Sequence, residues 1–129
     1  MSLRLKNITF YWLPLIVYGV LIYIQSDYPS PDKLPSFILM DKMLHFLAYG
    51  IMGILFYRAY QTLRIKNNRR MLFLLSVVSA SLYGISDEIH QYFVPARNAD
   101  ILDVIADTLG AVCIVYIYQW WTGQKETAR

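Results

Sequence analysis

Charged residues and cysteines are scarce in this sequence. Of its 129 residues, 16% are charged and 57% are hydrophobic, whereas an average soluble domain has about 25% charged residues. The one cysteine, Cys113, excludes an internal disulfide and any metal site built from several thiolates. So little charge in a chain of this length favours a single membrane-embedded domain covering residues 1–129.

Long apolar runs are also missing, because none reaches the roughly 20 residues that span a bilayer core of about 30 Å. Four shorter runs are present, at residues 8–24, 43–57, 71–86 and 108–121. To cross a membrane, a helix built on any of these runs must also include the polar residues that flank it. The sequence therefore predicts four transmembrane helices, over about residues 8–25, 42–60, 70–93 and 100–121.

The first of these runs follows two basic residues, as a signal peptide does, but it is longer than a signal-peptide core and has no Ala-x-Ala site after it. We expect it to be a retained helix, kinked at Pro14. It has neither regularly spaced small residues nor charge, which predicts a peripheral position. Pro29, Pro31 and Pro35 predict an extended loop between the first two helices.

The basic residues predict the orientation of the four helices. Nine of the twelve lie before the first helix, between the second and third, or after the fourth: Arg4, Lys6, Arg58, Arg64, Lys66, Arg69, Arg70, Lys125 and Arg129. By the positive-inside rule, both termini of this all-α four-helix bundle are cytoplasmic. All acidic residues except Glu126 then lie toward the outer side. The excess of base is thus a topology signal and gives no reason to expect nucleic-acid binding.

Small residues recur at helical spacing and predict how the helices pack. Such residues let helix backbones approach closely in a bilayer. They are Gly50 and Gly53 on the second helix, Ser76, Ala80 and Gly84 on the third, and Ala106 and Gly110 on the fourth. We expect these faces to form the interior of the bundle.

Ionisable side chains share helix faces near the predicted outer ends. Residues three or four apart lie on one face, which groups Asp41, His45 and Tyr49, then Asp87, His90 and Gln91, then Asp100, Asp103 and Asp107. A charged group inside a membrane costs several kcal/mol unless it is paired or hydrated. The three groups are therefore expected to face one another around an outward-opening cleft, with Lys42 and Arg97 as the nearby fixed cations.

Plainer interpretations exist for single residues in this cluster. Asp100 and Asp103 have the spacing of a helix N-cap and its third residue, and Asp41 is a possible cap of the second helix. Tyr49 is a candidate packing aromatic. Asp107 lies too far into its helix to be a cap and is a candidate for a structural hydrogen bond across the bundle.

The two histidines keep several roles open. With Asp87, Glu88 or Asp103, either His45 or His90 offers a mixed nitrogen and oxygen set for a divalent metal, although no HExxH spacing is present. Alternatively, a histidine oriented by a carboxylate acts as general acid or base. A third interpretation is that the histidine is a hydrogen-bonded polar group inside the bundle.

Two ordered motifs resemble those of the VanZ-like membrane proteins. DKMLHFLAYGIMG (residues 41–53) is similar to the family's first signature, and LYGISDEIHQYFVPARNADILDVIADTLG (residues 82–110) to its second. The match is carried by Asp41, Lys42, His45, Tyr49, Asp87, Glu88, Gln91, Pro95, Arg97, Asp103 and Gly110. Ala96 and Ile114 stand where the family often has glycine.

The resemblance implies a multi-pass protein of the bacterial cytoplasmic membrane. The family's namesake is associated with resistance to teicoplanin, without the altered peptidoglycan precursors that protect against vancomycin. A cell-envelope role in antibiotic resistance is therefore expected, with membrane lipid and a lipoglycopeptide or lipid-linked precursor as partners. No nucleotide, phosphate or acyl-CoA motif is present.

Two functions from different classes fit these residues. In the first, the cleft binds an amphiphilic ligand; the residues expected to bind it are Asp41, Lys42, Tyr49, Gln91, Arg97, Asp103 and Asp107, with Glu88 as a further acceptor. In the second, the protein is an intramembrane hydrolase or transferase. Its general base would be Glu88 or Asp87 and its proton partner or metal ligand His45, while Ser86 lacks a G-x-S-x-G frame.

Overall fold

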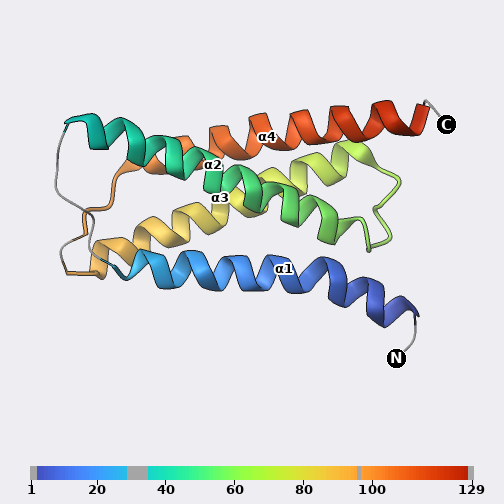
Figure 1. Cartoon of the computed structure of the whole chain (residues 1–129), viewed down its shortest axis with the longest axis horizontal. Helices are drawn as coiled ribbons and strands as arrows, with labels where there is room; N and C mark the ends of the chain where they lie inside the picture. Colours follow the sequence, from blue (N-terminus) through green and yellow to red (C-terminus); the bar gives the residue numbers. More distant parts are fainter. Residues whose placement is uncertain (1–2, 29–34, 96, 128–129) are drawn as a thin grey trace.

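The computed structural model describes residues 3–28, 35–95 and 97–127, and this part of the chain contains four helices and no strand. The helices are α1 (Leu3–Ser26), α2 (Pro35–Tyr60), α3 (Arg69–Phe93) and α4 (Ile101–Thr127). They alternate in direction, so α1 begins and α4 ends at the same end of the bundle (Figure 1). We call that end, which also carries the α2–α3 connection, the basic end. The opposite end, where α2 and α4 begin, is the acidic end.

All four helices are long and apolar enough to cross a membrane. They contain 24, 26, 25 and 27 residues, or about 36 to 40 Å at 1.5 Å per residue. The predicted all-α four-helix architecture is confirmed. The apolar runs are extended as expected, because flanking ionisable residues continue each helix beyond its hydrophobic stretch.

Capping residues account for where α3 and α4 begin and where α3 ends. The Asn68 side chain accepts a hydrogen bond from the Met71 backbone N–H at 3.0 Å, at the start of α3. That helix ends at Phe93 because Val94 is extended and Pro95 follows. The Asp100 carboxylate accepts the Leu102 backbone N–H at 2.9 Å, so the predicted N-cap of α4 is correct.

The start of α2 differs from the prediction. Pro35 was expected in an extended loop, but α2 begins at this residue. A proline is tolerated in a first helical turn because its missing N–H would have no partner there. Asp41 consequently lies inside α2 and is not its cap. The expected loop prolines Pro29 and Pro31 lie outside the described residues, as does Ala96.

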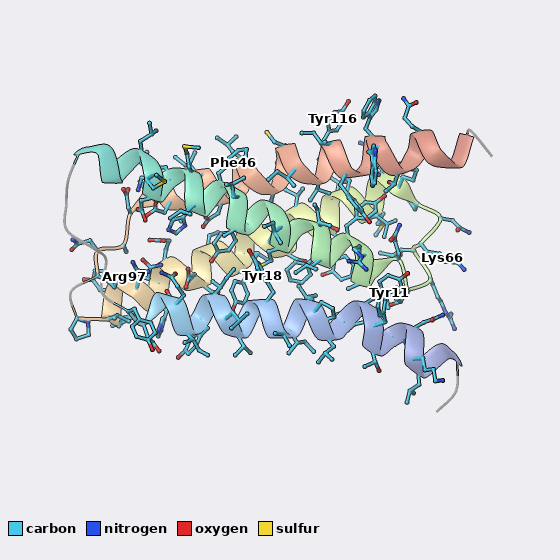
Figure 2. All side chains as sticks on the ribbon, in the orientation of Figure 1. Tyr11, Tyr18, Phe46, Lys66, Arg97 and Tyr116 are labelled. Carbon is cyan, nitrogen blue, oxygen red and sulfur yellow. The ribbon has the colours of Figure 1, made fainter. Side chains whose placement is uncertain are left out.

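The first helix is peripheral, as predicted. In the described part of the chain α1 contacts α2 and, over a shorter stretch, α3, but not α4. It continues through Pro14 as one helix. Two tyrosines tie it to the bundle: Tyr18 donates to the Ala48 carbonyl at 3.0 Å and Tyr83 to the Gly19 carbonyl at 2.7 Å. Figure 2 shows Tyr18 directed from α1 toward α2 and α3.

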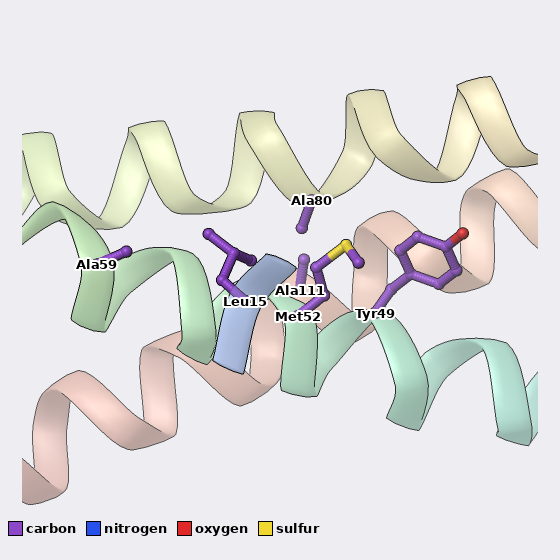
Figure 3. Packing of buried hydrophobic residues seen from close by; sticks show 6 residues of the cluster. All are labelled: Leu15, Tyr49, Met52, Ala59, Ala80 and Ala111. Atoms are coloured by element: carbon purple, nitrogen blue, oxygen red, sulfur yellow. The ribbon is translucent and has the colours of Figure 1, made fainter. Parts of the chain in front are cut away.

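The closest helix contact, between α2 and α4, depends on glycine. A Cβ on Gly110 would collide with the Phe46 backbone, and one on Gly53 would lie 2.6 Å from Val115 Cγ2. Ile114, where the family often has glycine, packs directly against Gly50, so the small residue is supplied by the facing helix. Figure 3 shows the apolar core beside this contact, with Met52 of α2 next to Ala111 of α4 and Ala80 of α3.

Candidate functional site

Buried polar side chains gather at the acidic end of the bundle. Three come from α3 and two from α4, and each is at most 7% exposed: Asp87, Glu88, Gln91, Asp103 and Asp107. Except for His90 and the partly exposed Asp100, the polar residues predicted on the third and fourth helices are thus buried, near the partly buried Asp41, Lys42 and His45 of α2. The expected convergence of three helix ends is present.

Lys42 is the cation that connects α2 to the start of α4. Its Nζ donates to Asp100 Oδ2 at 2.6 Å and to Asp103 Oδ1, and it lies 3.8 Å from Asp41 Oδ2. The Lys42 ammonium, together with the Leu102 backbone N–H, holds the pKa of the Asp100 carboxyl below its ordinary value. Lys42 therefore compensates much of the negative charge at this end of α4.

His45 forms a hydrogen-bonded pair with the fully buried Asp107. The two are joined by a 2.9 Å contact between His45 Nδ1 and Asp107 Oδ1. His45 Nε2 lies 3.9 Å from Asp103 Oδ2. Gly84 makes room for the pair, because a Cβ there would approach Asp107 Oδ2 to 2.5 Å. The bundle thus encloses the carboxylate that orients this imidazole.

Asp87 is held by two uncharged donors. Tyr49 Oη donates to Asp87 Oδ2 at 2.9 Å, and Gln91 Nε2 donates to the same oxygen at 3.2 Å. The ring of Tyr49 is parallel to that of His45, with centroids 6.1 Å apart. Tyr49 is therefore a packing aromatic, as one interpretation of the sequence expected, and also a hydrogen-bond donor to Asp87.

A pocket of about 470 Å³ lies between α1, α2 and α3 at the acidic end. Its polar wall consists of Asp41, His45, Tyr49, Asp87, Gln91, Arg97 and Gln25, and its apolar wall of Leu21, Ile22, Leu44 and Ala48. Leu21 and Leu44 are 57% and 55% exposed, so the apolar wall reaches the surface that faces lipid. The pocket combines ionisable groups with access from the membrane. We call it the α1–α2–α3 pocket.

The predicted site residues divide into three groups around this pocket. Six of them line it: Asp41, His45, Tyr49, Asp87, Gln91 and Arg97. Lys42, Asp103 and Asp107 do not line it, but each contacts a residue that does. Lys42 contacts Asp41, and the two aspartates contact His45. Glu88 is apart from both groups. It accepts the Asp100 backbone N–H at 2.9 Å and lines a different groove, between α3 and α4.

Three residues have the donor set for a divalent cation. Asp41, His45 and Asp103 each offer one ligand atom, and these atoms lie within 4.8 Å of one another. A mixed set of imidazole and carboxylates suits several divalent metals. However, Lys42 already donates to Asp103 and lies near Asp41, so a metal ion would compete with a fixed ammonium at this point.

Helix α1 supplies site features that the sequence did not reveal. Arg97 Nε donates to the Ser26 carbonyl at 3.3 Å, which fixes this arginine against the end of α1. His90, a predicted candidate, instead pairs with Asp27 at 2.7 Å, outside the pocket. Gln25, a polar residue directly after the first apolar run, also lines the pocket; its position was a signal in the sequence, but it was not among the predicted site residues.

Comparison with known proteins identifies the family but provides no close relative. Neither the curated proteins nor the solved structures contain a match to this chain. The model of the VanZ/LLP1 family matches residues 3–122. This range includes α1, α2 and α3, most of α4, and every residue of the site described above. The chain therefore belongs to the VanZ/LLP1 family and is a VanZ-like membrane protein with four membrane-spanning helices.

Proposed function

We propose that the α1–α2–α3 pocket binds an amphiphilic ligand of the bacterial cell envelope. One observation carries the proposal: a single pocket of about 470 Å³ has ionisable groups on one wall and membrane-exposed leucines on another. A ligand with a polar head and an acyl chain would satisfy both walls, because its chain can remain in the lipid while its head enters the bundle.

The polar wall defines the chemistry of the head. Asp41 and Asp87 accept hydrogen bonds or a positive charge, whereas Arg97 binds a phosphate or carboxylate. A lipoglycopeptide or a lipid-linked envelope precursor carries groups of both kinds. Membership of the family adds teicoplanin as the first lipoglycopeptide to test, and a contribution to teicoplanin resistance as the expected role.

The proposed orientation places the pocket on the outer side of the cytoplasmic membrane. The basic end carries Arg58, Arg64, Lys66, Arg69 and Arg70, and the positive-inside rule assigns such an end to the cytoplasm. Both termini are then cytoplasmic. The acidic end consequently faces the side from which a glycopeptide or an exported precursor would arrive.

The test is teicoplanin and vancomycin dose-response in a Gram-positive host at matched membrane abundance. Leu21→Trp should narrow the pocket, whereas Val17→Trp, one turn away on the exposed face of α1 and outside the pocket, is its control. Asp41→Asn removes the negative charge of a lining carboxylate, and Asp27→Asn is the corresponding control outside the pocket. We expect the two pocket variants to reduce teicoplanin protection and both controls to retain it.

Two other results would contradict the proposal, and a third would exclude only the role in teicoplanin resistance. Equal protection by all four variants would show that the pocket is not the site. Equal loss with both antibiotics would indicate a general envelope defect. If the wild type gives no protection, the teicoplanin role is wrong, and binding of lipid-linked precursors to the protein in nanodiscs then decides whether the pocket binds any amphiphile.

The His45–Asp107 pair favours a second candidate, an intramembrane hydrolase or transferase. Asp107 can hold the proton on Nδ1, which leaves Nε2 to take a proton from water or a substrate hydroxyl. The activated oxygen would attack an ester or phosphate group of the ligand, Arg97 would stabilise the developing negative charge, and His45 would return the proton to the leaving group. His45, rather than Glu88, is the general base in this proposal because Glu88 does not line the pocket.

The two candidates differ in the expected response to His45→Gln. If the protein is an enzyme, His45→Gln should abolish product formation and retain ligand binding. Product is measured by mass spectrometry of lipids incubated with the protein in nanodiscs. Binding alone predicts a partial loss of affinity and no product from the wild type. Asp107→Asn should follow His45→Gln in the catalytic case, since both changes remove the oriented base.

A further inference from the structure

Glu88 has one buried carboxylate oxygen without a hydrogen-bond partner. Its Oε2 accepts the Asp100 backbone N–H at 2.9 Å, but Oε1 is buried and has no partner in the described part of the chain. The residue is 5% exposed. Buried polar atoms almost always have a partner, because an unpaired one costs about 1–3 kcal/mol, and more if charged. An exogenous donor would remove this penalty.

Glu88 lines a groove of about 400 Å³ that shares no residue with the α1–α2–α3 pocket. The groove lies between α3 and α4, and exposed apolar residues form most of it: Ile85, Ile89, Tyr92, Phe93 and Ile101. No lysine or arginine is among its described lining residues, whereas Asp100 joins Glu88 there. It is thus a membrane-facing apolar groove with two carboxyl groups.

This combination selects the charge of an occupant. Asp100 is already paired with Lys42, whereas Glu88 Oε1 has no partner among the described residues. An ammonium group would supply both the missing N–H donor and a compensating charge to Glu88, which an anionic head cannot do. Tyr92 and Phe93, at 73% and 76% exposure, add aromatic rings beside the same opening; such rings attract cations. The apolar residues along α3 and α4 provide a path for acyl chains.

We propose that the α3–α4 groove binds an aminophospholipid, with its primary ammonium hydrogen-bonded to Glu88 Oε1. The two-carbon arm of an ethanolamine headgroup separates the ammonium from the phosphate. The phosphate therefore remains at the mouth of the groove while the ammonium reaches inward. This lipid site is additional to the α1–α2–α3 pocket and does not depend on the function proposed for that pocket.

The test is retention of lipid by the full chain, measured by native mass spectrometry after equilibration with an equimolar mixture. The mixture contains phosphatidylethanolamine, phosphatidylcholine and phosphatidylglycerol with identical acyl chains. Phosphatidylcholine keeps the positive charge but has no N–H, and phosphatidylglycerol has hydroxyl donors without the cation. We expect preferential retention of phosphatidylethanolamine by wild type, reduced at least about tenfold in Glu88→Gln, as loss of a charged hydrogen bond implies. Asp27→Asn, outside the groove, should retain it as wild type does.

A second pair of variants keeps the test informative if Glu88→Gln does not fold. Ile89→Trp fills the groove, and Ile105→Trp places the same side chain on an exposed position of α4 outside it. Only Ile89→Trp should lose phosphatidylethanolamine. Equal retention of the three lipids by wild type, preference for phosphatidylglycerol or phosphatidylcholine, or unchanged retention in folded Glu88→Gln or Ile89→Trp would each overturn the proposal.

Discussion

The charged side chains at the two ends of the bundle lie in opposite environments. At the acidic end, carboxylates are buried between helices and receive donors from Lys42, His45 and Tyr49. At the basic end, Arg64, Lys66 and Arg70 are exposed, and Arg58 lies over the ring of Tyr11 at 5.4 Å. Figure 2 shows Arg97 at the acidic end and Lys66 at the other.

The buried charges of the acidic end form a site, whereas the exposed charges of the basic end are expected to orient the bundle in the membrane. Burial inside a membrane protein costs several kcal/mol per charge unless it is offset by partners, so the buried carboxylates require the surrounding network. Exposed basic residues can snorkel to the interface and need no protein partner. Substitutions at the acidic end should therefore have larger effects than matched substitutions at the basic end.

The largest expected effect comes from glycine substitution in α4. Gly110→Ala places a Cβ against the Phe46 backbone, which can move only if α2 and α4 separate, whereas Gly123→Ala meets the flexible end of the Arg69 side chain. We expect Gly110→Ala to destabilise the protein by about 3 kcal/mol or more and Gly123→Ala by less than about 1 kcal/mol. Thermal unfolding in detergent measures both, and similar melting temperatures would contradict the packing described.

A smaller effect is expected from the coupling between histidine and aspartate. His45 and the fully buried Asp107 should show an interaction free energy of about 1–3 kcal/mol in a double-mutant cycle using His45→Gln and Asp107→Asn. The more exposed pair of His90 and Asp27 is the matched control and should give less than about 1 kcal/mol. Equal couplings would show that burial does not strengthen the His45–Asp107 pair.

The smallest effect concerns the titration of Asp100. Its pKa is below the ordinary value of 3.8, chiefly because of Lys42. The ionised Asp100 therefore stabilises the fold fully above pH 3.8, and this contribution is lost as the pH falls through the lowered pKa. Lys42→Met should raise the pKa of Asp100 toward 3.8, as measured by ¹³C NMR of the carboxyl group, whereas Lys6→Met at the basic end should leave it unchanged. An unchanged titration in Lys42→Met would contradict the ion pair.

Helix number and the clustering of ionisable residues were predictable from the sequence because both follow from local patterns. The four apolar runs gave the four helices, and the spacing of three or four residues placed Asp41, His45 and Tyr49 on one face. The start of α2 was not predictable from Pro35, because a proline is compatible with both a loop and a first helical turn.

The sequence also could not predict that Asp87 lines the α1–α2–α3 pocket while Glu88 lines the α3–α4 groove. Adjacent residues on an α-helix project about 100° apart, and the packing of α4 against α3 decides which of them faces the pocket. Asp87 faces Tyr49 of α2, and Glu88 faces the start of α4. Likewise, the space that Gly84 leaves for Asp107 depends on the contact between two helices.

Photocrosslinking of an amphiphile tests the central claim most directly, since it locates the bound ligand on the protein. The protein in nanodiscs is irradiated with teicoplanin that carries a diazirine in its acyl chain, and the modified residues are mapped by mass spectrometry. The pocket predicts crosslinks at Leu21 and Leu44, which unlabelled teicoplanin removes and Asp41→Asn diminishes. Crosslinks at Trp120 of the basic end, or spread evenly along the exposed apolar faces without competition, would contradict binding in the α1–α2–α3 pocket.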